Sequence, residues 1–211
     1  MSYDIRFSDA MLDSLRGEIK GMMSEKRFLH VLGVERMAVT LGELYLPNDL
    51  PTLRAAALLH DITKEYSLEK HLQIYQRCGI MSYDADLCMP KIMHAKTAAA
   101  LIPELFPSFA TDAVISAVRW HTTGRAGMTL AEKIIYLADY IDDTRRFEDC
   151  VELRKMFFDA VPSDMTEDER MRHLDRVMIR SFDLTIQGLI QDKMPICRDT
   201  FEARNALICA N

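Results

Sequence analysis

Ionisable side chains interrupt the apolar pattern of this chain in the segment AALLHDITKE, residues 56–65. His60 and Asp61 end an otherwise apolar helical stretch, and Lys64 follows one turn later. An ionised carboxylate is disfavoured by the dipole at a helix C-terminus, and burying it without a partner is costly. Asp61 is therefore expected to need a cation, and Lys64 is a candidate to face a bound phosphate.

Further histidines occupy apolar stripes or ends of expected helices. His30 shares a stripe with Val34 and Leu41 by helical spacing, His94 lies in an apolar stripe of its own, and His121 closes a helix. Taken singly, each could equally be a core histidine bonded to a backbone carbonyl. His60 is the fourth such residue, and the chain contains only six histidines.

Asp139 lies in EKIIYLADYIDD among apolar neighbours, where an ionised carboxylate also needs a partner. A bond to a neighbouring Arg or Ser is the alternative explanation. Four inward-facing histidines and two aspartates, from separate helical segments, together predict a metal centre in a helical core. Imidazole and carboxylate without thiolate suit Fe, Mn, Co or Zn and exclude a closed zinc site of the cysteine type. Six donors exceed the needs of one catalytic ion, so two ions bridged by a carboxylate fit better.

Helices must position these side chains, because apolar residues recur at three- and four-residue spacing nearly throughout the 211 residues. The pattern predicts an all-α single domain over 1–211, with ligands at 30–139 and C-terminal helices at 148–211 packed against them. Thr129-Glu132 and Thr166-Glu169 have capping-box spacing. The expected helices are 8–22, 24–45, 51–61, 67–78, 90–106, 109–121, 129–144, 148–160, 165–190 and 199–209.

Composition limits the partners and the compartment. Lys and Arg total 26 against 32 Asp and Glu, so bulk electrostatic binding to DNA or RNA is not expected. The five cysteines are scattered without a CxxC pair, which is typical of reduced thiols in the cytoplasm. The N-terminus does not resemble a signal peptide, and no run of about 18 apolar residues predicts a membrane span.

The ordered set His30, His60-Asp61 and Asp139 resembles the HD-domain metal-dependent phosphohydrolase superfamily. Longer stretches are similar to the YqeK family of symmetrical diadenosine tetraphosphate hydrolases, from about residue 20 to about residue 208. They are RFLHVLGVERMA, AALLHDITKE, HAKTAA, VRWHTTGRAGMTLAEKIIYLADYID and DTFEARN.

This resemblance implies a di-metal centre, with iron as the first choice and Mn, Co, Mg or Zn as alternatives. It implies Asp61 as the bridging carboxylate and hydrolysis of diadenosine tetraphosphate to two ADP by a metal-activated water. A cytoplasmic enzyme is expected, with a dinucleoside polyphosphate or nucleoside diphosphate as its partner and a homodimer left open. The implied metal ligands are His30, His60, Asp61, His94, His121 and Asp139.

Asp61 and Lys64 are the predicted catalytic residues, and several other side chains are candidates for phosphate or nucleotide contacts. The cationic candidates have an alternative role as ordinary surface charges. The TTGRAG loop, residues 122–127, could likewise be a simple turn between helices. Arg204 and Asn205 match a family motif without a derivable role, and His71 and His173 are expected to face solvent. The predicted substrate-binding residues are Arg27, Lys64, Lys96, Thr122, Thr123, Gly124 and Arg125.

Two other functions remain open at this stage. The first is an HD-type phosphohydrolase of another nucleotide, namely a nucleotidase, a triphosphohydrolase or an alarmone hydrolase. The second is a metal-dependent nucleotide-binding module without turnover. The metal ligands are shared by the enzymes, so only the substrate cleft and a product assay separate them.

Overall fold

The computed structural model describes residues 7–81, 87–160 and 165–210, and within these ranges it contains helices and no strands. The all-α prediction is confirmed, and each expected helix is present within a few residues of its predicted ends. None of the helices in the described part has the length and hydropathy that a bilayer span requires. The helices are α1 Asp9–Lys20, α2 Glu25–Tyr45, α3 Leu50–Leu59, α4 Leu68–Cys78, α6 Pro90–Leu105, α7 Asp112–Trp120, α8 Leu130–Ile141, α9 Glu148–Asp159, α10 Glu167–Gln191 and α11 Arg198–Ala210.

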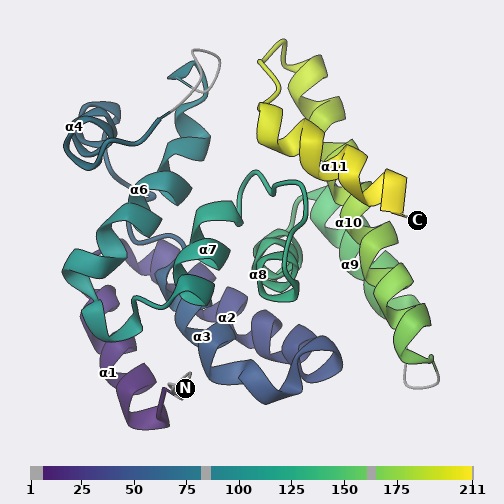
Figure 1. The fold of residues 1–211 in the computed structure, drawn as a ribbon, viewed down its shortest axis with the longest axis horizontal. Coiled ribbons are helices and arrows are strands. Elements are labelled where there is room, and N and C mark those ends of the chain that lie inside the picture. Colours follow the sequence, from purple (N-terminus) through teal and green to yellow (C-terminus); the bar gives the residue numbers. More distant parts are fainter. Residues whose placement is uncertain (1–6, 82–86, 161–164, 211) are drawn as a thin grey trace.

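Helix α3 lies at the centre of the N-terminal group of helices, in contact with α1, α2, α7 and α8 (Figure 1). Seven of its ten residues are buried, which explains why its sequence is apolar almost all round. The C-terminus of α3 therefore ends inside the protein. His60 and Asp61, at this end, are 0% and 2% exposed.

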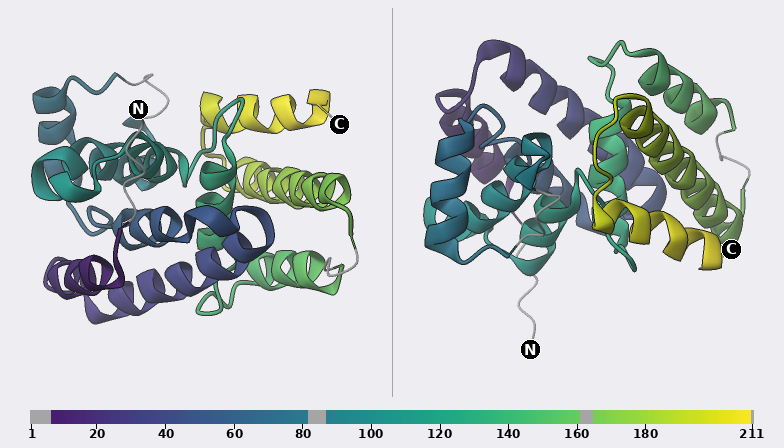
Figure 2. Two further views of the ribbon diagram at one scale, coloured as in Figure 1. Left: turned by 60° about the horizontal axis from the view of Figure 1, so that its bottom comes forward. Right: turned by 90° about the horizontal axis from the view of Figure 1, so that it is seen from above.

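Helix α8 connects this group to the C-terminal helices, since it contacts α2, α3 and α7 on one side and α9 and α10 on the other (Figure 1). Figure 2 shows α9, α10 and α11 stacked beside one another, with α10 in the middle. A single hydrophobic cluster includes Leu12 of α1, Leu58 of α3, Leu137 of α8 and Phe182 of α10. The C-terminal helices thus pack on the helices that carry the predicted ligands.

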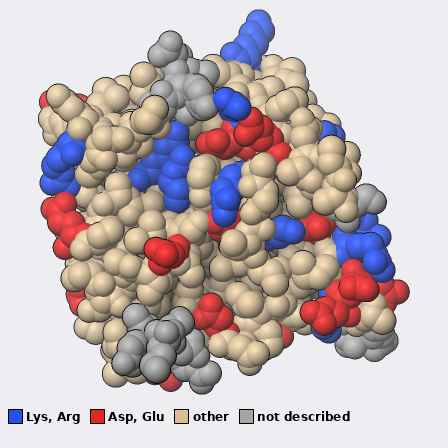
Figure 3. Space-filling view, in the orientation of Figure 1, with Lys and Arg blue, Asp and Glu red and all other residues tan. Residues whose placement is uncertain are grey.

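Most helices begin with a side chain that satisfies a free backbone amide. Both predicted capping boxes are present, at Thr129 with Glu132 and at Thr166 with Glu169. Helices α3, α6 and α9 have no capping side chain, and the N-cap residue of α9 is Phe147. The face in Figure 3 shows acidic and basic side chains interspersed rather than one continuous basic surface, in keeping with the net charge of −6.

Candidate metal centre

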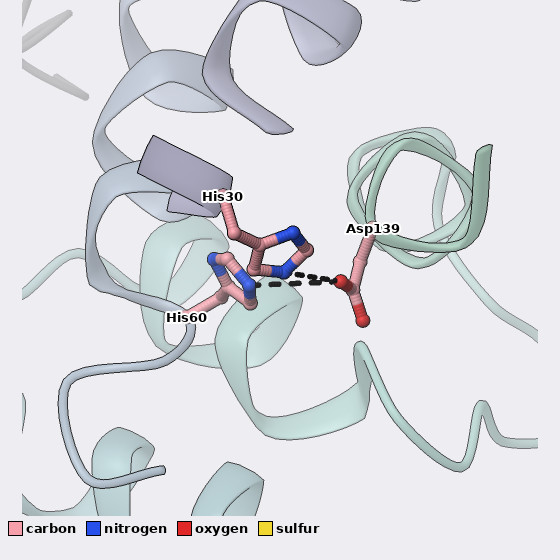
Figure 4. Close-up of side chains that lie close together, drawn as sticks. All are labelled: His30, His60 and Asp139. Atoms are coloured by element: carbon pink, nitrogen blue, oxygen red, sulfur yellow. Dashed lines mark ion pairs between the residues drawn. The ribbon is translucent and has the colours of Figure 1, made fainter. Parts of the chain in front are cut away.

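The structure brings all six predicted metal ligands together around Asp61. His30 comes from α2, His60 ends α3, and Asp139 comes from α8, and Figure 4 shows these three side chains pointing toward one another. His94 lies on α6 and His121 ends α7. Five elements separated in sequence therefore meet at one buried place in the helical core.

One half of the cluster consists of His30, His60 and Asp139 together with one oxygen of Asp61. Oδ1 of Asp139 is 3.0 Å from Nε2 of His30 and 3.8 Å from Nε2 of His60. Oδ2 of Asp61 is 3.7 Å and 3.4 Å from the same two nitrogens. Ligand atoms of His30, His60 and Asp139 all lie within 4.8 Å of one another, a separation that a single ion can span.

The other half consists of His94 and His121 with the second oxygen of Asp61. Oδ1 of Asp61 is 3.1 Å from Nε2 of His94 and 3.8 Å from Nε2 of His121. The two Nε2 atoms are 2.9 Å apart. Each carboxylate oxygen of Asp61 thus faces its own pair of imidazoles.

Backbone carbonyls orient three of the rings. Nδ1 of His60 lies 2.6 Å from Ala57 O, and Nδ1 of His121 lies 2.7 Å from Val118 O, carbonyls that a helix end would otherwise leave free. His94 makes the same contact with Lys91 O at 2.8 Å. If each Nδ1 donates to its carbonyl, each Nε2 presents a lone pair to the cluster.

Several polar atoms of the cluster fit a cation better than any partner that the protein supplies. Nε2 of His30, Nε2 of His60 and Oδ1 of Asp61 are buried without a hydrogen-bond partner. The Nε2 atoms of His94 and His121 are 2.9 Å apart, and their lone pairs would repel each other unless a cation lies between them. Nitrogen and oxygen donors of this kind are those that Fe, Mn, Co and Zn accept, so the residues fit a metal site.

The ionisation of the cluster is set by burial and by neighbouring charge. Burial alone would raise the pKa of Asp61, but His60, His94 and Lys64 lower it well below its usual range. For Asp139, Arg145 and His30 likewise outweigh burial, and its pKa is well below the usual range. Burial opposes the charged form of His30, yet the nearby carboxylates of Asp139 and Asp142 raise its pKa to about 9. Both carboxylates are therefore ionised at neutral pH.

Three cationic side chains surround the cluster. A guanidinium nitrogen of Arg27 is 2.7 Å from Oδ2 of Asp61, and one of Arg145 is 2.5 Å from Oδ1 of Asp139. Nζ of Lys64 is 3.2 Å from Nε2 of His94 and 4.0 Å from Oδ1 of Asp61. Asp139 thus has the arginine partner that was the alternative explanation for its burial, namely Arg145. The same carboxylate also faces His30 and His60.

A cleft of about 1030 Å³ opens beside His30. Of the predicted substrate-binding residues, Arg27 and Lys64 line it, whereas Lys96 and the residues 122–125 are not among its lining residues. Arg145 and Phe147, which no motif in the sequence indicates, also line this cleft. It therefore opens toward the N-terminal turn of α2 and the loop after α8, not toward the TTGRAG loop.

The TTGRAG loop lies on another side of the cluster. Oγ1 of Thr122 is 3.2 Å from Nε2 of His94, while Thr123 is buried and bonds to the carbonyl of Gly124. Arg125 is paired with the buried carboxylate of Glu132 at 3.0 Å. Gly124 has φ +63°, and a Cβ there would lie 2.7 Å from the Phe182 ring. The backbone of Gly124 therefore lies close to the core of the protein rather than to the cleft.

Other predicted residues are buried by the fold. Lys96 is only 3% exposed on α6. The expectation that His71 and His173 face solvent is wrong, since they are 3% and 2% exposed. His71 bonds to Thr97 at 3.0 Å, and His173 bonds to the carbonyl of Phe157.

The family motif at the end of the chain takes part in helix packing. Arg204 of α11 forms an ion pair with Asp183 of α10. Both side chains are 30% exposed, and the pair joins two helices that stack against each other. This ion pair explains the place of Arg204 in the family motif by helix packing, without a contact to a ligand.

Comparison with known proteins reveals relatives along nearly the whole chain. Residues 27–144 match the model of the HD domain. The Bacillus subtilis protein named bis(5'-nucleosyl)-tetraphosphatase, symmetrical, is 32% identical, and the match covers 90% of this chain and 94% of that protein. The Staphylococcus aureus protein of the same name is 28% identical, covering 88% and 89%. A crystal structure from Clostridium acetobutylicum, described as an HD superfamily hydrolase involved in NAD metabolism, is 33% identical with a TM-score of 0.80, covering 94% and 97%.

Proposed function

The chain belongs to the HD domain family, and we propose on that basis that it is a symmetrical bis(5'-nucleosyl)-tetraphosphatase. It hydrolyses diadenosine tetraphosphate to two ADP. The observation that carries this proposal is the convergence of four imidazoles on the two oxygens of Asp61, next to a cleft lined by cationic side chains. Such a site suits cleavage of a phosphoanhydride bond.

The cluster would hold two ions with Asp61 as the shared ligand. His30, His60 and Asp139 would bind the first and His94 and His121 the second, because each group faces a different oxygen of Asp61. Six protein donors divided in this way leave open coordination positions for water and phosphate. The donor types suit iron, manganese, cobalt or zinc.

The side chains around the cluster hold and neutralise the tetraphosphate. Bound metal ions lower the pKa of a coordinated water and neutralise phosphoryl oxygens. Arg27, Lys64 and Arg145 line the cleft and supply N–H donors to the charge that spreads over the phosphates. Lys64 lies nearest to the second half of the cluster and would neutralise the charge of a phosphate bound there.

The position of the cluster explains why cleavage would be symmetrical. The cluster lies at one fixed depth below the cleft, so it reaches one phosphorus of a substrate whose nucleoside is held in place. If a nucleoside and its first phosphate occupy one side, the cluster meets the second phosphate of that half. The other half then leaves as a diphosphate, and both products are ADP.

Product chromatography tests the proposal directly. Diadenosine tetraphosphate should give two ADP, and water labelled with heavy oxygen should label one of the two ADP molecules. Equal amounts of AMP and ATP would contradict symmetrical cleavage. Turnover of a panel of nucleoside monophosphates, triphosphates, an alarmone and NAD would identify a phosphohydrolase of another nucleotide. Tight nucleotide binding without turnover would support a binding module.

A further inference from the structure

Phe147 is exposed at a place where the local rules of folding favour a different residue. Its side chain is 69% exposed at the rim of the cleft, and it occupies the N-cap position of α9 without making a capping bond. Helices α3 and α6 also lack a capping side chain, but each has a proline in its first turn, which removes one of the free amides. Side-chain hydroxyls cap six other helices of the described chain, at Ser8, Ser24, Ser67, Thr111, Thr129 and Thr166.

A phenylalanine at this position weakens the fold in two ways. It leaves an aromatic ring in water, and it offers no acceptor to the first amides of α9, of which, in the described part of the chain, only that of Cys150 has a side-chain acceptor, Oδ1 of Asp149. Positions at which a sequence violates local preference without a structural gain are often functional. The ring of Phe147 is therefore available to a ligand.

The backbone that carries Phe147 is held in place. Arg154 of α9 donates to Ile141 O at 2.7 Å and to Arg145 O at 2.9 Å, and it also bonds to Asp142 O. These bonds fix the loop between α8 and α9, so the ring is presented from a defined backbone rather than from a free loop end. A preorganised group of this kind loses little entropy when a ligand binds.

Charges of both signs line the cleft, namely Glu25, the Arg36–Asp143 ion pair, and an inner and an outer set of cations. Arg27 and Arg145 are paired with Asp61 and Asp139 in the cluster. Lys26 and Arg146 are exposed and also line the cleft, and within the described part of the chain no carboxylate lies within salt-bridge distance of either. The outer set can therefore bind an anion without breaking an existing pair.

The size of the cleft is compatible with a nucleotide. Ligand sites for small molecules measure about 300–1000 Å³, and this cleft measures about 1030 Å³. Leu29 adds a second exposed apolar side chain to its wall, at 56% exposure. An apolar surface next to unpaired cations matches the chemistry of a base joined to phosphates.

We infer that the outer part of the cleft binds the nucleoside and the first phosphate of one half of the substrate. Phe147 stacks on the base, and Lys26 and Arg146 contact the first phosphate of the same half, while the cluster binds the central phosphates. This inference rests on the proposed function and deepens it. Since every base has a π-face, stacking on Phe147 tolerates different bases.

Calorimetric titration of the metal-loaded protein with ADP and with pyrophosphate tests the base contact. Phe147→Ala should bind ADP roughly tenfold more weakly and pyrophosphate unchanged, because pyrophosphate has no base. Phe147→Tyr retains a ring and should bind ADP like the wild type. Phe201→Ala removes another exposed ring, on α11, and should change neither affinity. Wild-type ADP affinity in Phe147→Ala would overturn the inference.

Phe147→Ser separates this role from a structural one. Serine can cap α9, so this variant should raise Tm by about 2–4 °C while it loses ADP affinity as Phe147→Ala does. A lower Tm together with weaker binding would instead mean that the ring supports the fold, and would overturn the inference.

Photolabelling with 8-azido-ADP locates the base. Label within residues 25–29 or 143–147 is expected, whereas label only within 121–127 would contradict the inference. If the wild type forms no ADP from diadenosine tetraphosphate, the proposed function fails. The ADP titration and the label would then still report whether Phe147 forms a base site.

Discussion

His30 is held between two carboxylates, with Nδ1 3.2 Å from Oδ2 of Asp142 and Nε2 3.0 Å from Oδ1 of Asp139. Asp142 is fully buried and lies just beyond the C-terminus of α8. A carboxylate that accepts the second N–H of a histidine ligand fixes the tautomer of the ring and makes the other nitrogen a stronger donor. Asp142 is therefore a positioning residue for the proposed ligand His30.

Asp142→Asn should weaken metal binding by about 10–100-fold, because the amide keeps the shape of the side chain but not its charge. Metal content after dialysis against a graded chelator series measures this change. Asp143→Asn removes an adjacent carboxylate that is exposed and paired with Arg36, and should keep wild-type metal content. Equal metal retention by both variants would show that Asp142 has no role at the centre.

Gly33 gives Asp142 the space that it needs. A Cβ at Gly33 would lie 2.8 Å from Oδ1 of Asp142 and 2.9 Å from a methyl carbon of Thr144. Gly33→Ala should therefore reduce both Tm and metal affinity, although alanine favours a helix by about 1 kcal/mol. Gly17→Ala on α1 meets no atom within 4 Å and should raise Tm. An increase in Tm for both variants would contradict the close contact.

Asp61→Ala should abolish metal binding at both halves of the cluster, because the two oxygens of Asp61 face different pairs of histidines. We expect turnover to fall by several orders of magnitude and metal content to fall with it. Asp13→Ala removes an exposed carboxylate of α1 and is the control. Full metal content and near-normal turnover in Asp61→Ala would refute the shared-ligand assignment.

The sequence indicates the cluster because an ionisable residue in an apolar stripe is conspicuous. His30 and Asp139 each stand among residues that helical periodicity assigns to the core. Asp142 and Arg145 lie in the polar run DDTRR, where periodicity gives no sign of which side chain turns inward. Only the packing of the loop against α2 distinguishes buried Asp142 from exposed Asp143.

The buried histidines outside the cluster carried a signal that their charged neighbours obscured. His71 shares a helical face with Ile74 and Tyr75, which are buried with it. His173 stands four residues before the buried Val177. The cleft itself depends on the tertiary approach of α2 and the loop after α8, and no local pattern predicts that approach.

Lys64→Ala should retain metal but lose turnover by about 100-fold, because Lys64 stabilises developing charge rather than holding the ions. Burial lowers the pKa of Lys64, and Asp61 opposes this effect. Lys70→Ala removes a lysine that lies over the Tyr66 ring and should leave turnover unchanged. Metal analysis and steady-state kinetics on the same samples decide the matter: loss of metal in Lys64→Ala would make the residue structural.

His71 should make the stability of the fold depend on pH. Burial, reinforced by His94, Lys64 and Lys70, lowers the pKa of His71 to about 4 from an ordinary value near 6.5. Between these values the unfolded chain binds the proton and the folded chain does not. The stabilisation is therefore complete above about pH 6.5 and is lost as the pH falls toward 4.

Replacing His71 by Asn removes this titration and keeps a polar side chain near Thr97, to which His71 bonds at 3.0 Å. The difference in unfolding free energy between wild type and His71→Asn should shrink by on the order of 1 kcal/mol between pH 7 and pH 5, after allowance for solvent screening. Urea titrations at several pH values, at a fixed metal concentration, measure this difference. If His71 is buried beside His94, the unfolding free energy of the wild type must rise with pH relative to that of the variant. Parallel pH profiles of the two proteins would show instead that His71 reaches water in the folded protein.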